Sequence, residues 1–175
     1  MTNKALHTAF LFAFTLLPLS LAGCGFSPIY SKHSTSSTHG YAVAAVLSQV
    51  DIGNIPDREG QILRNALIDR FYQDGRPDNH LYLLRVAPLK ETLTDLDVTE
   101  DSDTTRAELY MTTTMSLIRR DTRDVLLERN LRSVTSYNIL GSQFTTRISE
   151  QDAREAAIHD IARQIERQLS LYLKR

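Results

Sequence analysis

The sequence RAELYMTTTMSLIR, residues 106–119, has the clearest pattern in this chain of 175 residues. Apolar and polar side chains alternate along almost all of it. The apolar set is Ala107, Leu109, Met111, Met115 and Leu117, and the polar set is Glu108, Tyr110, Thr112, Thr114 and Ser116. Because successive side chains of a strand point to opposite faces, this alternation predicts a long strand with one covered face and one polar face.

The residues after this strand predict a hairpin and then a helix. Asp121-Thr122-Arg123-Asp124 has turn composition and leads into a second strand from Val125 to about Tyr137. Ser149 is predicted to begin the final helix as its N-cap, with Asp152 as the reciprocal partner. The apolar stripe of this helix consists of Ala153, Ala157, Ile161, Ile165, Leu169 and Tyr172 or Leu173.

The residues before the central strand predict a strand, a helix and an extended segment. Ala44–Ile52 alternates in polarity and predicts a first strand. Pro56 and Asp57 mark the start of a helix that ends before Gly75 and Pro77. Its apolar stripe consists of Ile62, Leu63, Ala66, Leu67 and Phe71. Leu81–Val98 is extended, and Pro88 makes the middle of this strand an edge or a bulge.

The predicted element order is therefore β-α-β-β-β-α. Two amphipathic helices and a sheet with one polar face predict an α+β fold. We expect a two-layer sandwich in which a four-stranded sheet carries both helices on one face.

The first residues have the layout of a secretory signal. Lys4 is followed by an apolar stretch, Ala9–Leu17, and by small residues before Cys24. The apolar stretch is about half of the roughly 20 residues that a membrane-spanning helix needs. Leu21-Ala22-Gly23-Cys24 also resembles the lipobox of bacterial lipoproteins, so we expect lipid attachment at Cys24, the single cysteine. Two or more acyl chains give stable membrane attachment.

These features predict three segments. Residues 1–23 are the signal peptide, residues 24–40 are the lipidated N-terminus with a flexible tether, and residues 41–175 are one domain. The tether is predicted because Ser31–Gly40 contains no apolar side chain to bury. Gly25 follows the cysteine where an aspartate would resemble an inner-membrane retention signal, so we expect outer-membrane sorting on the periplasmic side.

Several classes of function are not favoured by the sequence. The formal net charge of −1 is unlike that of a nucleic-acid-binding protein. We find no nucleophile, metalloprotease or phosphate-loop motif, and His159 is interpreted as a surface residue of a helix. The acidic run from Asp95 to Asp103 lacks the glycine and the final glutamate of an EF-hand loop. We therefore predict no enzyme, no metal and no cofactor.

Arginines gather around the predicted hairpin turn. The cluster consists of Arg119, Arg120 and Arg123. It is either a solvated strand end or a patch that binds anionic groups. The second alternative is considered because arginine forms bidentate hydrogen bonds with phosphate. Asp121 and Asp124 partly neutralise this cluster.

Three stretches resemble one known family. Cys24-Gly25-Phe26-Ser27-Pro28-Ile29-Tyr30 is similar to the C-G-F-x-P-L-Y opening of the alphaproteobacterial LptE family of lipopolysaccharide-assembly lipoproteins. Asp57–Leu67 and Ser136–Thr146 also resemble this family, although Gln143 and Thr145 replace an expected proline and alanine. The resemblance covers essentially the whole chain after residue 23, in short motifs that carry no catalytic residue.

The resemblance implies a partner and a role. Members of the family plug the outer-membrane β-barrel LptD and assist the insertion of lipopolysaccharide into the outer leaflet. The polar face of the central strand, with Tyr110, Thr112 and Thr114, is then a candidate barrel contact, because a plug in a polar lumen needs a polar surface. Arg119, Arg120 and Arg123 are candidates for lipopolysaccharide binding. The alternative is a periplasmic lipid-transport auxiliary lipoprotein that works with an inner-membrane exporter.

Overall fold

The structure is a computed structural model, and it describes residues 45–72, 75–76, 79–96, 105–139 and 142–174. The chain divides into the units Met1–Gly40 and Tyr41–Arg175, and every described residue belongs to the second unit. Cys24 and the predicted tether lie outside the described residues.

A long antiparallel hairpin forms the middle of the sheet. Strand β4, Thr105–Arg119, pairs along its whole length with β5, Val125–Ile139. The turn between them includes Arg123 in the left-handed region at φ 63°. The predicted inward side chains of β4 all have zero exposed surface, namely Ala107, Leu109, Met111, Met115 and Leu117. The central strand, its turn and its covered face are therefore confirmed.

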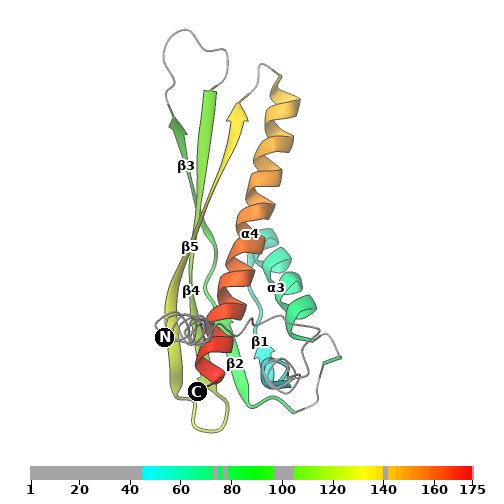
Figure 1. Ribbon diagram of the computed structural model, residues 1–175, viewed down its shortest axis with the longest axis vertical. Helices are drawn as coiled ribbons and strands as arrows, with labels where there is room; N and C mark the ends of the chain where they lie inside the picture. Colours follow the sequence, from blue (N-terminus) through cyan, green and yellow to red (C-terminus); the bar gives the residue numbers. More distant parts are fainter. Residues whose placement is uncertain (1–44, 73–74, 77–78, 97–104, 140–141, 175) are drawn as a thin grey trace, which may run out of the picture. The chain divides into compact units, whose positions relative to one another are not determined.

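Two shorter strands share the other edge of β4 (Figure 1). β2, Tyr82–Val86, pairs with the last part of β4, and β3, Lys90–Leu96, pairs with the first part. The segment predicted as one strand, Leu81–Val98, is thus two strands with a break around Pro88. The sheet has five strands rather than four, because β2 and β3 lie one after the other along the same edge.

The first strand is shorter than predicted. Residues 45–47 form a helical turn, and β1, Val50–Ile52, pairs in parallel with β2. The Ser48 hydroxyl donates to the carbonyl of Ala45 at 2.8 Å, and the Gln49 amide donates to Val46 at 3.1 Å. These local bonds give the apolar residues before β1 an alternative to strand pairing, which the alternation of polarity did not reveal.

Helix α3, Asp57–Phe71, begins at the predicted residue and buries most of the predicted stripe. Leu63 and Leu67 have no exposed surface, and Phe71 has 2%. Arg70 extends from its last turn to Glu166 of the final helix, with 2.8 Å between Nη1 and Oε2. This ion pair joins the two helices at a partly buried position.

Helix α4, Gln143–Leu173, begins before the predicted N-cap Ser149, which lies inside it together with Asp152. The amide and hydroxyl of Thr146 both donate to the Ser142 carbonyl at 3.1 Å, so local bonds close the first turn. Its first turns bury few apolar side chains, and the periodic pattern therefore indicated a later start. The predicted stripe from Ala153 to Leu169 is buried as expected.

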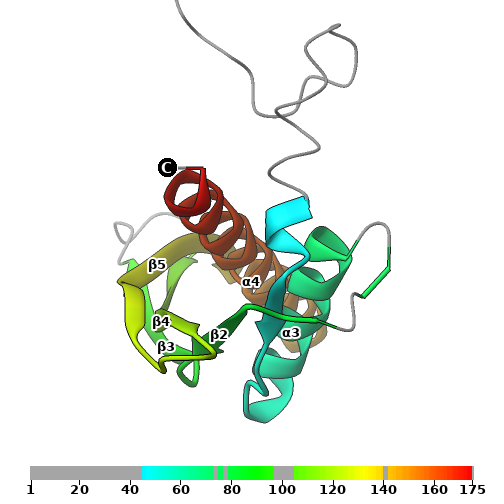
Figure 2. The ribbon, with the colours of Figure 1, turned by 90° about the horizontal axis from the view of Figure 1, so that it is seen from below.

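The layers match the predicted fold class. Helix α4 packs on β5 and β4, while α3 packs on α4 and β1, so both helices lie on one face of the sheet (Figure 2). The result is an α+β fold, as predicted. In the part of the chain that the structure describes, no helix is long and apolar enough to span a membrane.

We predict that Gly60→Ala destabilises the fold, although alanine is the better helix former by up to about 1 kcal/mol. A Cβ at Gly60 would lie 2.8 Å from Cγ2 and 2.9 Å from the carbonyl oxygen of Ile55, which is fully buried. Overpacking of this kind usually costs about 1–3 kcal/mol. Urea unfolding followed by circular dichroism should show a lower midpoint.

The matched control is Arg58→Ala in the same helix turn, where the side chain is exposed. Its unfolding free energy should change by no more than about 0.5 kcal/mol. A raised midpoint for Gly60→Ala would contradict the prediction and show that Ile55 moves aside.

Candidate functional site

The face of the sheet opposite the helices is here called the outer face. It consists of the even-numbered residues of β4 from Arg106 to Ser116 and of the residues paired with them on β2, β3 and β5. Within the described residues no helix covers it (Figure 2). Its β4 side chains from Glu108 to Ser116 are half-buried, since neighbouring strands flank them on both sides.

The predicted contact residues Tyr110, Thr112 and Thr114 lie together on this face, and two of them are held in place. The Tyr110 hydroxyl donates to Glu108, and the Arg132 guanidinium lies 4.7 Å from the centre of the Tyr110 ring. The hydrogen bond to Glu108 raises the pKa of Tyr110. The Thr114 hydroxyl donates to Asn130 Oδ1 at 2.8 Å. An aromatic ring with an arginine over it is a common feature of protein interfaces.

A β-bulge interrupts the edge shared by β2 and β3. Val86 pairs with Met115 and Lys90 pairs with Thr112, so three residues on one side face two on the other. The Ala87 amide donates to the Thr114 carbonyl at 2.9 Å, and the Thr113 hydroxyl donates to the Ala87 carbonyl at 2.8 Å. Pro88, which has no N–H to pair, occupies the extra stretch.

The bulge decides which side chains reach the outer face. Leu84 and Val86 of β2 point to the core, at 0% and 4% exposure. With unbroken alternation Lys90 would also point to the core and Glu91 outward. The extra residue reverses this order, because the side-chain period of a strand is two. Lys90 therefore shares the outer face with Thr112, and Glu91 lies on the helix side.

A shallow pocket of about 410 Å³ lies on the outer face beside the bulge. Across it, Lys90 of β3 and Arg132 of β5 both pair with Thr112 of β4. The full lining is Ala87, Pro88, Lys90, Thr112, Thr113, Thr114, Asn130, Leu131 and Arg132. It contains two cations, hydroxyls and an amide but no carboxylate.

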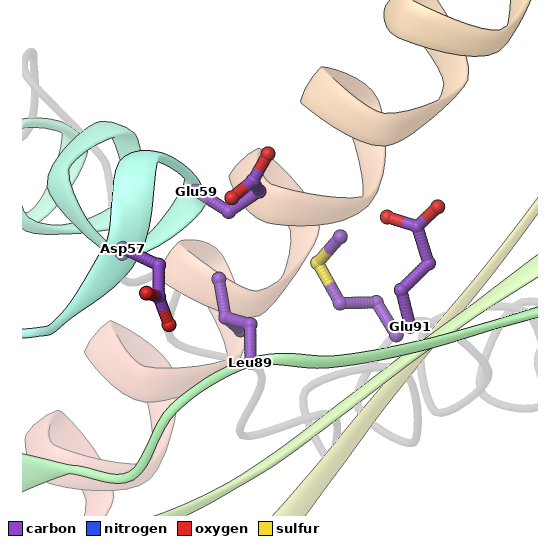
Figure 3. A pocket seen from close by; sticks show the side chains of 6 residues that line it. Asp57, Glu59, Leu89 and Glu91 are labelled. Carbon is purple, nitrogen blue, oxygen red and sulfur yellow. The ribbon is translucent and has the colours of Figure 1, made fainter.

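A second, smaller pocket of about 140 Å³ lies on the helix side of the bulge. Figure 3 shows Asp57 and Glu59 from the start of α3 and Glu91 from β3 around Leu89. Arg154 of α4 binds Glu91 through two hydrogen bonds of 2.7 and 2.8 Å, which raise the pKa of Arg154. Among the described residues, no three or more His, Cys, Asp or Glu side chains are placed to hold a metal ion.

The predicted arginine cluster lies at the hairpin turn, but its members differ. Arg120 forms an ion pair with Asp51 of β1, and Arg76 binds the other oxygen of that carboxylate at 2.6 Å. Arg119 and Arg123 are exposed, and their backbones close the turn through a 2.9 Å bond between the Arg123 amide and the Arg119 carbonyl. Arg120 therefore has a structural role that the sequence did not indicate.

Lys90, Asn130 and Arg132 were not among the predicted site residues. Alternation along β5 would have placed Asn130 and Arg132 on one face, together with Glu128 and Val134. Lys90 could not have been found in this way, because its direction depends on the bulge. Pro88 was the available signal, since it indicated an irregularity without fixing the register.

The fold and the comparisons together assign the family. The model of the lipopolysaccharide-assembly family LptE matches residues 47–169. The chain belongs to the LptE family. This family consists of non-enzymatic lipoproteins, and membership implies a role in lipopolysaccharide assembly.

Solved structures resemble this LptE-family chain in fold. A putative lipoprotein from Caulobacter crescentus has a TM-score of 0.59 and 19% identity, covering 75% of this chain and 95% of its own. A minor lipoprotein from Acinetobacter baumannii has a TM-score of 0.56 and 24% sequence identity. The match covers 70% of this chain and 90% of the Acinetobacter chain. Rare lipoprotein B from Shewanella oneidensis has a TM-score of 0.51 and 11% sequence identity. The match covers 72% of this chain and 97% of the Shewanella chain. A search of curated proteins gives no match.

We predict that Thr113→Val destabilises the domain by about 1–2 kcal/mol. Valine keeps the shape of threonine but leaves the Ala87 carbonyl without its donor, and Thr113 is only 7% exposed. Chemical unfolding of the variant would measure the loss. Thr94→Val, at an exposed position of β3, is the control and should be close to neutral. Equal stability of the two variants would show that the hydroxyl does not hold the bulge.

Proposed function

We propose that the chain is an outer-membrane lipoprotein that binds and plugs an LptD-type β-barrel. In this role it assists assembly of lipopolysaccharide into the outer leaflet. The proposal adds a partner and a location to the role that LptE-family membership implies. It also includes the absence of catalysis, because the chain is proposed to act by binding.

The observation that carries this proposal is the uncovered outer face of the long β4–β5 hairpin. Soluble sheets of this class bury one face under helices and leave the other to water or to a partner. Here that face is polar but includes an aromatic side chain, Tyr110, with Arg132 over its ring. Such a surface suits the inner wall of a large barrel, which is polar and wet rather than apolar.

The proposed anchor is Cys24, which would hold the domain at the periplasmic side of the outer membrane. Lipoproteins among the structural relatives support this part of the proposal. Anchoring confines the domain to a thin layer next to the membrane, which raises its effective concentration near a membrane-embedded partner.

We also propose that arginines of the hairpin turn contact lipopolysaccharide. Arg119 and Arg123 are now stronger candidates for this contact than Arg120. Arg119 and Arg123 form no ion pair among the described residues, whereas Arg120 binds Asp51. The first two are therefore the free cations of this cluster, and Arg120 mainly joins the turn to β1.

Bulky substitutions on the outer face should weaken the barrel complex. Thr112→Trp and Thr114→Trp add a large ring to a face that would lie against the barrel wall. The measurement is the amount of barrel that co-purifies with C-terminally tagged protein from detergent-solubilised envelopes. We expect a stoichiometric barrel with the unmodified chain and at least about tenfold less with either variant.

Arg167→Trp, on the exposed side of α4, is the control and should retain the barrel. If the Thr112 and Thr114 variants co-purify as much barrel as the unmodified chain, the outer face is not the surface that contacts the barrel. Co-purification of an inner-membrane exporter instead of a barrel would favour the transport-auxiliary function.

Charge reversal at the turn tests the lipid contact. Arg119→Glu combined with Arg123→Glu should weaken lipopolysaccharide binding several-fold, because arginine–phosphate pairs are lost and repulsion replaces them. Binding of labelled lipopolysaccharide to the purified full chain measures this, with Arg58→Glu on α3 as the control. Binding equal to that of the unmodified chain would exclude this turn as the lipid site.

A further inference from the structure

The pocket beside the bulge offers donors from three adjacent strands. Lys90 contributes an ammonium, Thr112 a hydroxyl and Arg132 a guanidinium. The Thr114 hydroxyl donates to Asn130 Oδ1, which leaves the amide NH₂ group of Asn130 as a further donor. The rest of the lining is apolar or backbone, and no carboxylate is part of it, so the polar side of this pocket is suited to an oxyanion.

The two cations of this pocket form no ion pair among the described residues. They lie on the strands that flank β4, two strand spacings or roughly 10 Å apart, with Thr112 between them. One oxyanion above Thr112 is therefore within reach of both long side chains. The Arg132 guanidinium lies 4.7 Å from the centre of the Tyr110 ring, which restricts its movement on the outer face beside Thr112.

The surroundings favour a protein carboxylate over a lipid phosphate. Surfaces that bind anionic lipid gather several Lys and Arg side chains with few acids between them. The outer face instead mixes Arg85, Lys90, Arg106 and Arg132 with Glu108 and Glu128. Tyr110 and the exposed Val134 lie beside the pocket, on the pair of residues next to Thr112. Aromatic and arginine side chains in a mixed polar setting are typical of protein interfaces.

Exposure sets a further condition on the ligand. Lys90 and Arg132 are exposed, and an exposed ion pair contributes little in water. A carboxylate carried by a surface that covers the outer face would be shielded from solvent and held more strongly. The ligand and the cover are therefore expected to belong to the same molecule.

We propose that this pocket receives an Asp or Glu side chain of the protein that covers the outer face. The carboxylate accepts hydrogen bonds from Lys90, Thr112 and Arg132 and fixes the position of the partner along β4. The inference rests on the proposed function in one respect, namely that the covering protein is the barrel.

The experiment combines charge reversal with a crosslink. Tagged full-length protein carrying Lys90→Glu and Arg132→Glu is compared with Arg129→Glu, a reversal on β5 whose side chain lies on the opposite side of the sheet. We expect the double variant to retain at least about tenfold less barrel than the unmodified chain, and Arg129→Glu to retain it. A photo-crosslinking residue at Val134, which is exposed beside the pocket, with Lys90, Thr112 and Arg132 intact, should attach to a barrel peptide that contains Asp or Glu. Changing that acid to Lys should restore binding of the double variant.

Two outcomes would overturn the inference while leaving the proposed function in place. One is undiminished barrel binding by the double variant, and the other is a crosslink from Val134 to lipid. If the unmodified chain retains no barrel, the proposed function fails and the crosslink alone decides the inference. An acidic peptide of another protein would support it, and the absence of a protein crosslink would overturn it.

Discussion

The register of two strands against one edge of β4 is the constraint on which the rest of the structure depends. β2 and β3 together have one residue more than the part of β4 that they face, and the excess lies at Ala87–Leu89. Since strand side chains alternate between faces, one extra residue reverses every direction after it. Leu84 and Val86 complete the core on one side of the bulge, while Glu91 replaces such apolar residues on the other.

This reversal explains how the far end of the sheet accommodates α4. The Glu91 carboxylate lies on the helix side and keeps part of its surface in water, so a partner stabilises it without being required. Arg154 supplies that partner through two bonds to Glu91 and a third, of 2.6 Å, to Glu150 of its own helix. Beyond the bulge these ion pairs therefore add to the apolar packing of Leu109 and Met111, which belong to the same core cluster as Ile161 and Ile165 of α4.

Sequence periodicity was sufficient where one face of an element is buried along its whole length. The strand at residues 106–119, the helix beginning at Asp57 and the stripe from Ala153 to Leu169 were all predicted on this basis. It failed where local hydrogen bonds decide the backbone, as in the helical turn at 45–47 and the first turns of α4 before Ser149. The outer-face residues of β4 were found by the same alternation. Lys90 was missed because its direction is set by register, which depends on pairing with a distant strand.

The bulge also gives the two faces opposite charge at one point of the sheet. Its helix side has the carboxylates of Asp57, Glu59 and Glu91, and its outer side has Lys90 and Arg132. Among the described residues, ion pairs neutralise the helix side, through Arg154, but not the outer side. Like charges on exposed side chains of strands two spacings apart repel only weakly in water, so the fold tolerates the outer pair. The same pair would be unfavourable beneath a covering protein unless that protein supplied a negative group, because desolvation strengthens the repulsion. The outer cations therefore discriminate among surfaces that could cover the sheet, favouring one with a carboxylate opposite Thr112 and disfavouring the rest.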